Sequence, residues 1–388
     1  MTKEKQEKIY VPLHNHSHYS QLDGYATIDE YVKVSKEFGF PGFGLADHGT
    51  ASGLYSFIKK MQAEGLIPVP GVEFYVAPEN PKGAKLKEAF YYGEGGRKAP
   101  KYDVSRGAYT HLTVFAYNNK GLSNLFKLSS MSYDPSHFYT KPRIDTNMLA
   151  EHSEGLIVTT GCPSSEVSTR FLLGQDEKAY EYAQRMKDIF GDNYYVEIMD
   201  HGMHNEELER ILVPKQIKLA KDLGLKLIAT NDSHYCKKSD AEGHEHFLAM
   251  STKSKMSEPT KENGGKRFAF SGDEYYIKTY DEMYSIYPEE VAAEALANTL
   301  ELTEKCKGIT LNYRDDLRPF IEIPEGYTEA TYLQKLIYDG FVKKRGHEPR
   351  EIQEESARRI QEEFKVLHSN DFISYFLVVN DYIQYAHD

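Results

Sequence analysis

Residues 13–24 have the sequence LHNHSHYSQLDG, a histidine-rich stretch with the spacing of a metal-binding strand. His14 and His16 are two positions apart, so an extended backbone points both imidazoles to the same side. Much later in the chain, Asp232 and His234 repeat this spacing. Each pair is suited to binding one metal ion. The wide separation of the two pairs in the sequence predicts a site assembled from many strands.

The composition is that of a globular protein and excludes several classes of function. A length of 388 residues predicts two or three domains. No apolar run approaches the ~20 residues that span a bilayer, so no membrane partner is expected. The charged residues 1–8 lack the apolar core of a secretory signal, and three cysteines favour a reducing, cytoplasmic setting. A net charge of −12 argues against coating nucleic acid through bulk charge, but is compatible with a nuclease whose carboxylates bind metal.

Short apolar strands alternate with helical segments over roughly the first 275 residues. Helices are predicted at 28–38, with Thr27 as N-cap, at 52–64 and 120–131, and in a long segment that ends at Leu223. About seven strand–helix units imply parallel strands with crossover helices, closed as a barrel or open as a sheet. The predicted strands are 8–13, 42–46, 66–76, 110–116, 155–159, 194–199 and 225–230.

Side chains that can bind metal fall at or just beyond the strand ends, where barrel enzymes place their chemistry. Their mixture of imidazole, carboxylate and one thiolate suits zinc, manganese or iron(II) better than magnesium. Nine ligands are too many for one ion but enough for two or three if a carboxylate bridges. The candidates are His14, His16, Asp23, His48, Glu73, His111, Cys162, Asp232 and His234.

A cluster of this kind indicates phosphoester hydrolysis. Two or three bound ions lower the pKa of a shared water to about 7 and neutralise phosphate oxygens, so no separate protein base is required. His201 also ends a strand and is a candidate for contact with the phosphate or the leaving group. Lys141 and Arg143 are candidates for holding backbone phosphates. Each motif alone has an ordinary structural explanation, and it is their joint placement that favours a site.

The pattern changes in three places. Residues 78–107 and 254–272 interrupt the strand–helix alternation and are predicted to be loops. Beyond about residue 275 the sequence becomes mainly helical, with helices expected at 281–306, 328–346, 349–367 and 372–385. The sequence therefore divides into a site-bearing region, 1–275, and a mainly helical region, 276–388.

The site motifs resemble those of the polymerase-and-histidinol-phosphatase (PHP) domain. The similarity is greatest to the PHP domain that begins bacterial DNA polymerase III alpha subunits, because residues 294–300 and 375–383 resemble the segment leading into the polymerase palm. It covers nearly the whole chain. The main motifs are residues 14–17, 22–24, 46–49, 70–73 and 231–234, supported by 139–145, 152–157, 161–162 and 197–202.

The resemblance implies a fold and a set of roles. The fold would be an α/β, distorted seven-stranded (β/α)7 TIM-like barrel, followed by a mainly helical segment leading into the palm. The intact ligand set implies a 3′-to-5′ exonuclease that proofreads the primer 3′ end of DNA, alongside the rest of the polymerase and other replisome subunits. By motif, His14, His16 and Asp232 would hold one ion, Glu73 would bridge to a second completed by His111 and Cys162, and Asp23, His48 and His234 would hold a third.

One departure from the family and two alternatives remain. The sequence stops where the family's Gly-Ser-rich palm motif would begin, before the catalytic aspartates, so this chain is not expected to polymerise DNA. It would be a truncated portion or one piece of a split polymerase. The alternatives are a small-molecule phosphatase of the histidinol-phosphatase type, and a non-catalytic scaffold that metals stabilise.

Overall fold

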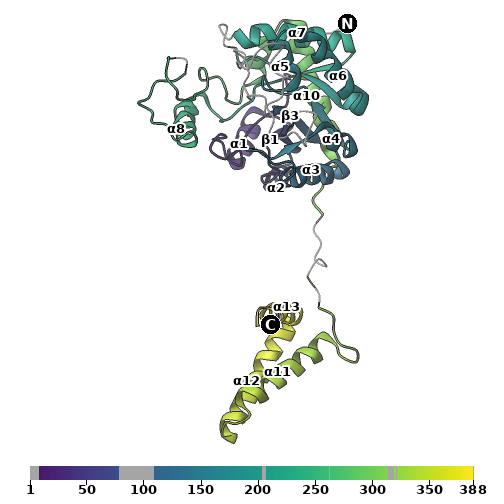
Figure 1. The fold of residues 1–388 in the computed structure, drawn as a ribbon, viewed down its shortest axis with the longest axis vertical. Helices are drawn as coiled ribbons and strands as arrows, with labels where there is room; N and C mark the ends of the chain where they lie inside the picture. Colours follow the sequence, from purple (N-terminus) through teal and green to yellow (C-terminus); the bar gives the residue numbers. More distant parts are fainter. Residues whose placement is uncertain are drawn as a thin grey trace. The chain divides into compact units, whose positions relative to one another are not determined.

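A computed structural model describes residues 8–77, 109–202, 207–261, 263–312, 319 and 321–387. The chain divides into two compact units, Met1–Leu311 and Asn312–Asp388. The first holds the sheet and the second holds three helices (Figure 1). The predicted loop at 78–107 lies outside the described residues.

A single mixed sheet forms the centre of the first unit, in the order β1-β2-β3-β5-β6-β7 with β4 paired to β2. Parallel pairing was expected throughout, and this was wrong at β3, which is antiparallel to both β2 and β5. Alternation of apolar residues reports burial and not strand direction, so the sequence pattern did not reveal the reversal. The strands are β1 (Gly42–His48), β2 (Ile67–Val76), β3 (Thr110–Ala116), β4 (Arg143–Ile144), β5 (Leu156–Thr159), β6 (Tyr194–Met199) and β7 (Lys226–Thr230).

An extended segment before α1 links β1 to the chain that follows β7. The strand predicted at 8–13 is not a regular strand, because its hydrogen bonds are few and shared between two partners. Residues 12 and 15 accept from the backbone N–H groups of Gly44 and Ala46, and residues 14 and 16 exchange bonds with Ser233. A Cβ on Gly44 would lie 2.1 Å from the Leu13 oxygen, so this close approach requires glycine. The segment bridges the two edges of the sheet and produces the distorted barrel expected from the sequence.

Helices surround the sheet. The prediction for α1 (Ile28–Phe38) is confirmed, including Thr27, which forms a capping box with Glu30. The sequence did not predict β4 or the helices α4, α5, α6 and α8. The other helices of this unit are α2 (Leu54–Ala63), α3 (Asn119–Ser132), α4 (Thr146–Glu151), α5 (Glu166–Leu172), α6 (Asp176–Phe190), α7 (Glu207–Leu223), α8 (Ala241–Ser251), α9 (Tyr280–Ile286) and α10 (Glu289–Lys305).

The helix predicted at 281–306 is split at Pro288 into α9 and α10. Helix α10 packs on β7, where Asn298 donates to the Leu227 carbonyl at 2.8 Å. Its Thr299 hydroxyl accepts from the Val11 N–H at 3.0 Å. Residues 276–311 therefore pack with the sheet, whereas the sequence division placed them with the C-terminal helices.

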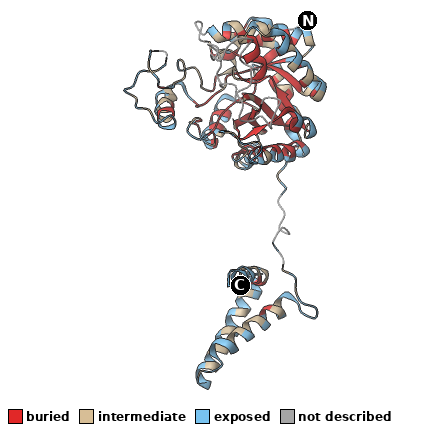
Figure 2. Cartoon of the chain, viewed as in Figure 1, coloured by how far each residue is buried: buried red, intermediate tan, exposed pale blue. Residues whose placement is uncertain are grey.

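The second unit consists of α11 (Glu329–Arg345), α12 (Arg350–Ser369) and α13 (Ile373–His387), which match the predicted helices within two residues. Figure 2 shows buried residues concentrated in the sheet of the first unit and sparse along these three helices. Their small core consists of Leu333, Ile373 and Leu377, whereas Tyr382 and Tyr385 are exposed. None of the helices that the structure describes is long and apolar enough to cross a membrane.

Candidate metal centre

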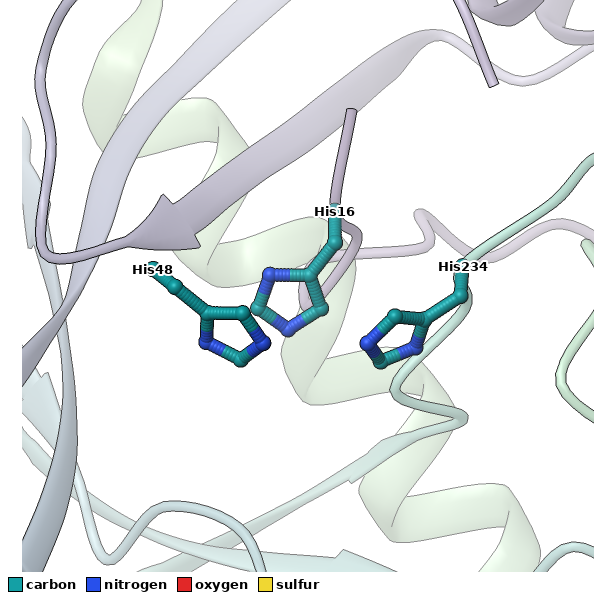
Figure 3. Close-up of side chains that lie close together, drawn as sticks. All are labelled: His16, His48 and His234. Carbon is teal, nitrogen blue, oxygen red and sulfur yellow. The ribbon is translucent and has the colours of Figure 1, made fainter. Parts of the chain in front are cut away.

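One rim of the sheet collects the candidate ligands from several separate segments. His48 ends β1, Glu73 lies in β2 and His111 is the second residue of β3. Because β3 is antiparallel to β2, its first residues lie at the rim where β2 ends. Figure 3 shows the rings of His16, His48 and His234 side by side, with centroids 4.0 Å apart for His16–His48 and 4.5 Å for His16–His234.

Glu73 is a central contact of the cluster. Its carboxylate is buried and touches three histidines on three segments. Oε2 lies 2.5 Å from His48 Nδ1, and Oε1 lies 3.1 Å from His111 Nδ1 and 3.5 Å from His14 Nε2. A carboxylate with both oxygens surrounded in this way has the placement of a bridging ligand.

Asp232, which follows β7, is a second such contact. Its Oδ1 lies 2.9 Å from His16 Nε2, 3.5 Å from His14 Nε2 and 3.9 Å from His234 Nδ1. Asp232 has φ of 46°, a left-handed conformation that costs a non-glycine residue free energy. Asn231 beside it donates to the carbonyls of Glu274 and Tyr276, each at 2.8 Å, which fixes this strained turn.

The remaining candidates join the same network. Asp23 Oδ2 lies 2.8 Å from His48 Nε2 and 3.8 Å from His234 Nε2. Cys162 Sγ lies 3.5 Å from His111 Nδ1. The structure thus brings all nine predicted ligands together, although their assignment to individual ions stays a prediction.

The donor set fits divalent cations. Within the described part of the chain, His14 Nε2, His48 Nδ1, His234 Nε2 and both Glu73 oxygens are buried and form no hydrogen bond of ordinary geometry, although several of them lie close to one another. Unsatisfied buried polar atoms are costly, and a cation at this position would satisfy them together. Three triads have ligand atoms within 4.8 Å of one another, namely His14–His16–Glu73, His48–Glu73–His111 and His16–His48–His234.

The pKa values of the ionisable groups in the cluster are shifted in opposite directions. Burial opposes ionisation of Asp23 and Asp232, but neighbouring histidines hold the pKa of both carboxyls well below the usual value. Burial would lower the pKa of His48, but Glu73 and Asp23 raise it to about 10. Burial and the adjacent His48 and His234 lower the pKa of His16 to about 3. Carboxylates that stay ionised at neutral pH are ready to accept a cation.

Two buried carboxylates support the ligands and were not among the predicted site residues. Glu197 Oε1 accepts from His14 Nδ1 at 2.8 Å and from Thr230 Oγ1 at 2.7 Å, which directs His14 Nε2 toward Glu73 and Asp232. Its signal in the sequence is a lone acid within the apolar strand 194–199.

Asp47 is the other supporting carboxylate. It accepts from the Ser17 N–H and the Ser20 hydroxyl, each at 2.7 Å, and so holds the turn that carries Asp23. A Cβ on Gly24 would lie 2.1 Å from the Ser17 oxygen, so the turn also depends on glycine. Asp47 belongs to the motif at residues 46–49, which by itself indicates no role for this carboxylate.

His201, Lys141 and Arg143 lie outside the nine-residue network. His201 Nδ1 hydrogen-bonds to Glu209, its ring is 4.2 Å from Tyr275, and its Nε2 is buried without a hydrogen bond in the described structure. Lys141 is exposed and lies over the Tyr75 ring. Arg143 is 1% exposed and donates to the His137 carbonyl at 3.1 Å. Arg143 therefore supports its own segment, and the burial of its side chain does not favour the prediction that it holds a phosphate.

Comparisons with known proteins agree with this picture. Residues 12–201 match the PHP domain family, and residues 331–388 match the bacterial DNA polymerase III alpha NTPase domain family. DNA polymerase III subunit alpha of Mycobacterium tuberculosis is 38% identical over 385 residues, which is 97% of this chain and 31% of that protein. The Aquifex aeolicus subunit is 33% identical over 98% of this chain and 31% of its own length.

A solved amidohydrolase from Chromobacterium violaceum, covering 58% of this chain and 87% of its own, has 13% identity and a TM-score of 0.30, a likeness too low to bear on function. The chain spans about a third of the length of the curated relatives it matches. The two matched families occur in this chain in one order, PHP first and polymerase segment second. The chain therefore belongs, by its PHP domain and the segment after it, to the family of bacterial DNA polymerase III alpha subunits.

Proposed function

We propose that the first unit is a metal-dependent phosphodiesterase that removes nucleotides from a DNA 3′ end, as the 3′-to-5′ exonuclease module of a replicative polymerase. The observation that carries this proposal is the convergence of nine ligand-type side chains around unsatisfied buried atoms. Bound divalent ions would supply an activated water near neutral pH and would neutralise phosphate oxygens. DNA and the remaining replisome subunits are the proposed partners.

The proposed ligand groups are those that the family resemblance implies, and contacts between their members support them. His14, His16 and Asp232 would hold one ion and Asp23, His48 and His234 another, with zinc, manganese or iron as candidates. Glu73 would bridge to an ion completed by His111 and Cys162. Burial and Glu73 raise the pKa of the Cys162 thiol, so the cation itself would be needed to make it a thiolate.

We assign His201 the role of proton donor to the departing 3′ oxygen. Glu209 holds Nδ1, so Nε2 is the ring nitrogen left without a hydrogen bond in the described structure, and substrate would have to reach it at a buried position. Met199 of β6 is paired with Thr230 of the neighbouring parallel strand β7. His201 and Asp232 each follow their strand by two residues, so both lie at the same end of the sheet. His201→Gln should lower the rate ~100-fold or more without changing metal content.

The test is release of nucleotide from 3′-labelled single-stranded DNA by protein loaded with manganese or zinc. His14→Ala should abolish release, because it removes a ligand that touches both Glu73 and Asp232. His18→Ala is the matched control, since His18 is a neighbouring but exposed imidazole. Turnover of histidinol phosphate in place of DNA would favour the phosphatase alternative. Metal-dependent melting without any turnover would favour the scaffold.

A further inference from the structure

A basic loop lies beside the metal centre of this acidic chain. Residues 252–272, here called the basic loop, contain five basic side chains and two acidic ones, against a net charge of −12 for the whole sequence. The loop follows α8, which Figure 1 shows at one side of the first unit. Such a local excess of positive charge beside a candidate nuclease site points to a ligand with repeated negative charges.

Aromatic contacts connect the basic loop directly to a predicted metal ligand. The Phe270 ring meets the His234 ring edge-on, with centroids 4.7 Å apart. Phe270 also lies 4.6 Å from Tyr275 and 5.0 Å from His244. Phe268 packs edge-on against Phe270, with ring centroids 5.8 Å apart. The exposed ring of Phe268 is therefore connected to His234 of the metal centre through the ring of Phe270.

The loop has a defined structure. Thr260 and Arg267 form a β-bridge, and Gly264, with φ of 79°, lies in the turn between them. Arg267 is 6% exposed, donates to the Glu258 carbonyl at 2.9 Å and pairs with Glu245 on α8 at 2.7 Å. This buried arginine anchors the loop, and together with the β-bridge it fixes the backbone next to Lys261 and Lys266.

The outer surface of the loop combines an aromatic face with cations. Phe268 is 39% exposed, and the Lys261 ammonium lies 5.6 Å from its ring centroid. Lys255, Lys261 and Lys266 are exposed on the same loop. A strand of nucleic acid offers bases that stack on aromatic rings and phosphates that attract lysines, and both features occur here together.

We propose that the basic loop binds single-stranded nucleic acid and leads its end into the metal centre. A base stacks on Phe268, and backbone phosphates contact Lys261 and Lys266. This deepens the proposed function, on which it rests for the identity of the substrate. It selects a polynucleotide over a small phosphate ester, because a small ester has no second phosphate or base to reach the loop.

The test separates strand binding from hydrolysis. Binding of a labelled single-stranded oligodeoxynucleotide is measured by fluorescence anisotropy across a salt series, with chelator present so that the strand is not cut. Hydrolysis of a small chromogenic phosphodiester is measured separately with manganese. The loop variants are K261Q/K266Q, F268A and F268L, and the matched control is K178Q/K221Q, which removes two exposed lysines from α6 and α7.

The expected result is a selective loss of strand binding. K261Q/K266Q should weaken binding and reduce the slope of log affinity against log salt by about 1.4, because each contact to a single strand contributes about 0.7. F268A should weaken binding roughly 5-fold or more, and F268L should not restore it, since stacking needs a ring. All loop variants should keep their melting temperature and their hydrolysis of the small diester, and K178Q/K221Q should match the wild type.

Wild-type affinity and salt slope in K261Q/K266Q and F268A would overturn the proposal. Equal loss in the control variant would do so as well, because it would show that any two lysines suffice. Absence of nucleotide release from DNA by the metal-loaded wild type would instead refute the proposed function, and the anisotropy data would still decide whether the loop binds the strand.

Discussion

At the scale of single residues, the candidate centre depends on buried ligand atoms that form no hydrogen bond of ordinary geometry within the described part of the chain. His14 illustrates this, because its two ring nitrogens have different tasks. Nδ1 is hydrogen-bonded to Glu197 at 2.8 Å, and Nε2 is left between Glu73 and Asp232 at 3.5 Å from each. Burial would lower the pKa of His14, but Glu197 and Asp232 raise it well above its usual value. A bound cation would compete with that proton, so metal affinity should fall as the pH is lowered.

We expect Glu197→Gln to weaken metal binding 10- to 100-fold, because the amide no longer fixes the orientation and basicity of His14. The measurement is the metal content of dialysed protein at a series of buffered zinc or manganese concentrations. Glu301→Gln is the control, since it removes an exposed carboxylate whose partner, Lys226, lies at the surface. Unchanged affinity in Glu197→Gln would show that His14 is oriented by its packing alone.

His244 provides a test of pH dependence. It is buried, and its Nε2 donates to the Asp23 carbonyl at 2.9 Å. Burial and the adjacent His234 lower its pKa to about 4. The folded state therefore resists protonation while the unfolded state, with a pKa near 6.5, accepts the proton first, so stability is lost as the pH falls below about 6.5.

In chelator-treated protein, protonation linked to this histidine should lower the free energy of unfolding by about 2 kcal/mol as the pH falls from 7 to 5. His244→Gln keeps an amide donor and removes the titration, so its urea-unfolding free energy should fall by about 2 kcal/mol less over the same range. Parallel pH profiles for the two proteins would contradict the assignment.

At the scale of elements, the turn between the first histidines and α1 depends on one buried carboxylate. Asp47, at the end of β1, holds it through the Ser17 N–H, the Ser17 hydroxyl and the Ser20 hydroxyl. These three donors are buried, and each would be left without an acceptor if the carboxylate were removed.

Asp47→Ala should therefore destabilise the first unit by about 3 kcal/mol and release Asp23 from the site. Denaturant unfolding measures the first effect, and loss of bound metal measures the second. Asp29→Ala is the control, because Asp29 is an exposed partner in a surface ion pair with Lys60 and should change stability by less than about 1 kcal/mol. If Asp47→Ala lowers the free energy of unfolding no more than Asp29→Ala does, the turn is stabilised by contacts other than those of Asp47.

Elements also show what could be predicted from sequence. The strands β1, β2, β3, β5, β6 and β7 were found within two residues, because each is a short apolar run between polar segments. The direction of β3 and the shared hydrogen bonds of the first extended segment were not found, since both depend on partners far away in the sequence. The nine candidate ligands were found from spacing and strand ends, whereas Glu197 was missed because it lies inside an apolar strand.

At the scale of the whole molecule, the boundary after Leu311 has physical consequences. Helix α10 buries Ala292, Ala295, Leu296 and Leu302 with the core of the first unit. Without it, the side of β7 that these residues cover would be exposed to water, at a cost of about 25 cal/mol per Å² of apolar surface.

A chain ending at residue 311 should therefore fold, with a melting temperature within a few degrees of the first transition of the full chain. A chain ending at residue 275 should be insoluble or should lack a cooperative transition. Circular dichroism melting and gel filtration of the two chains decide between these outcomes. Cooperative folding of the shorter chain would show that α9 and α10 are dispensable to the barrel.

Metal removal should act on one unit alone, because the predicted ligands all lie in the first. Each ion present at 100 times its dissociation constant stabilises the folded unit by about 2.7 kcal/mol, which corresponds to a rise of about 5 °C in melting temperature. Calorimetry of the full chain with and without chelator should therefore show the transition of the first unit falling by about 5 °C for each ion lost. The transition of α11–α13, whose core is Leu333, Ile373 and Leu377, should not move.

Glu73→Gln should reproduce the chelated curve in part, since its carboxylate contacts three of the histidines. Identical curves with and without chelator would show that the buried atoms of the centre are not held together by a cation.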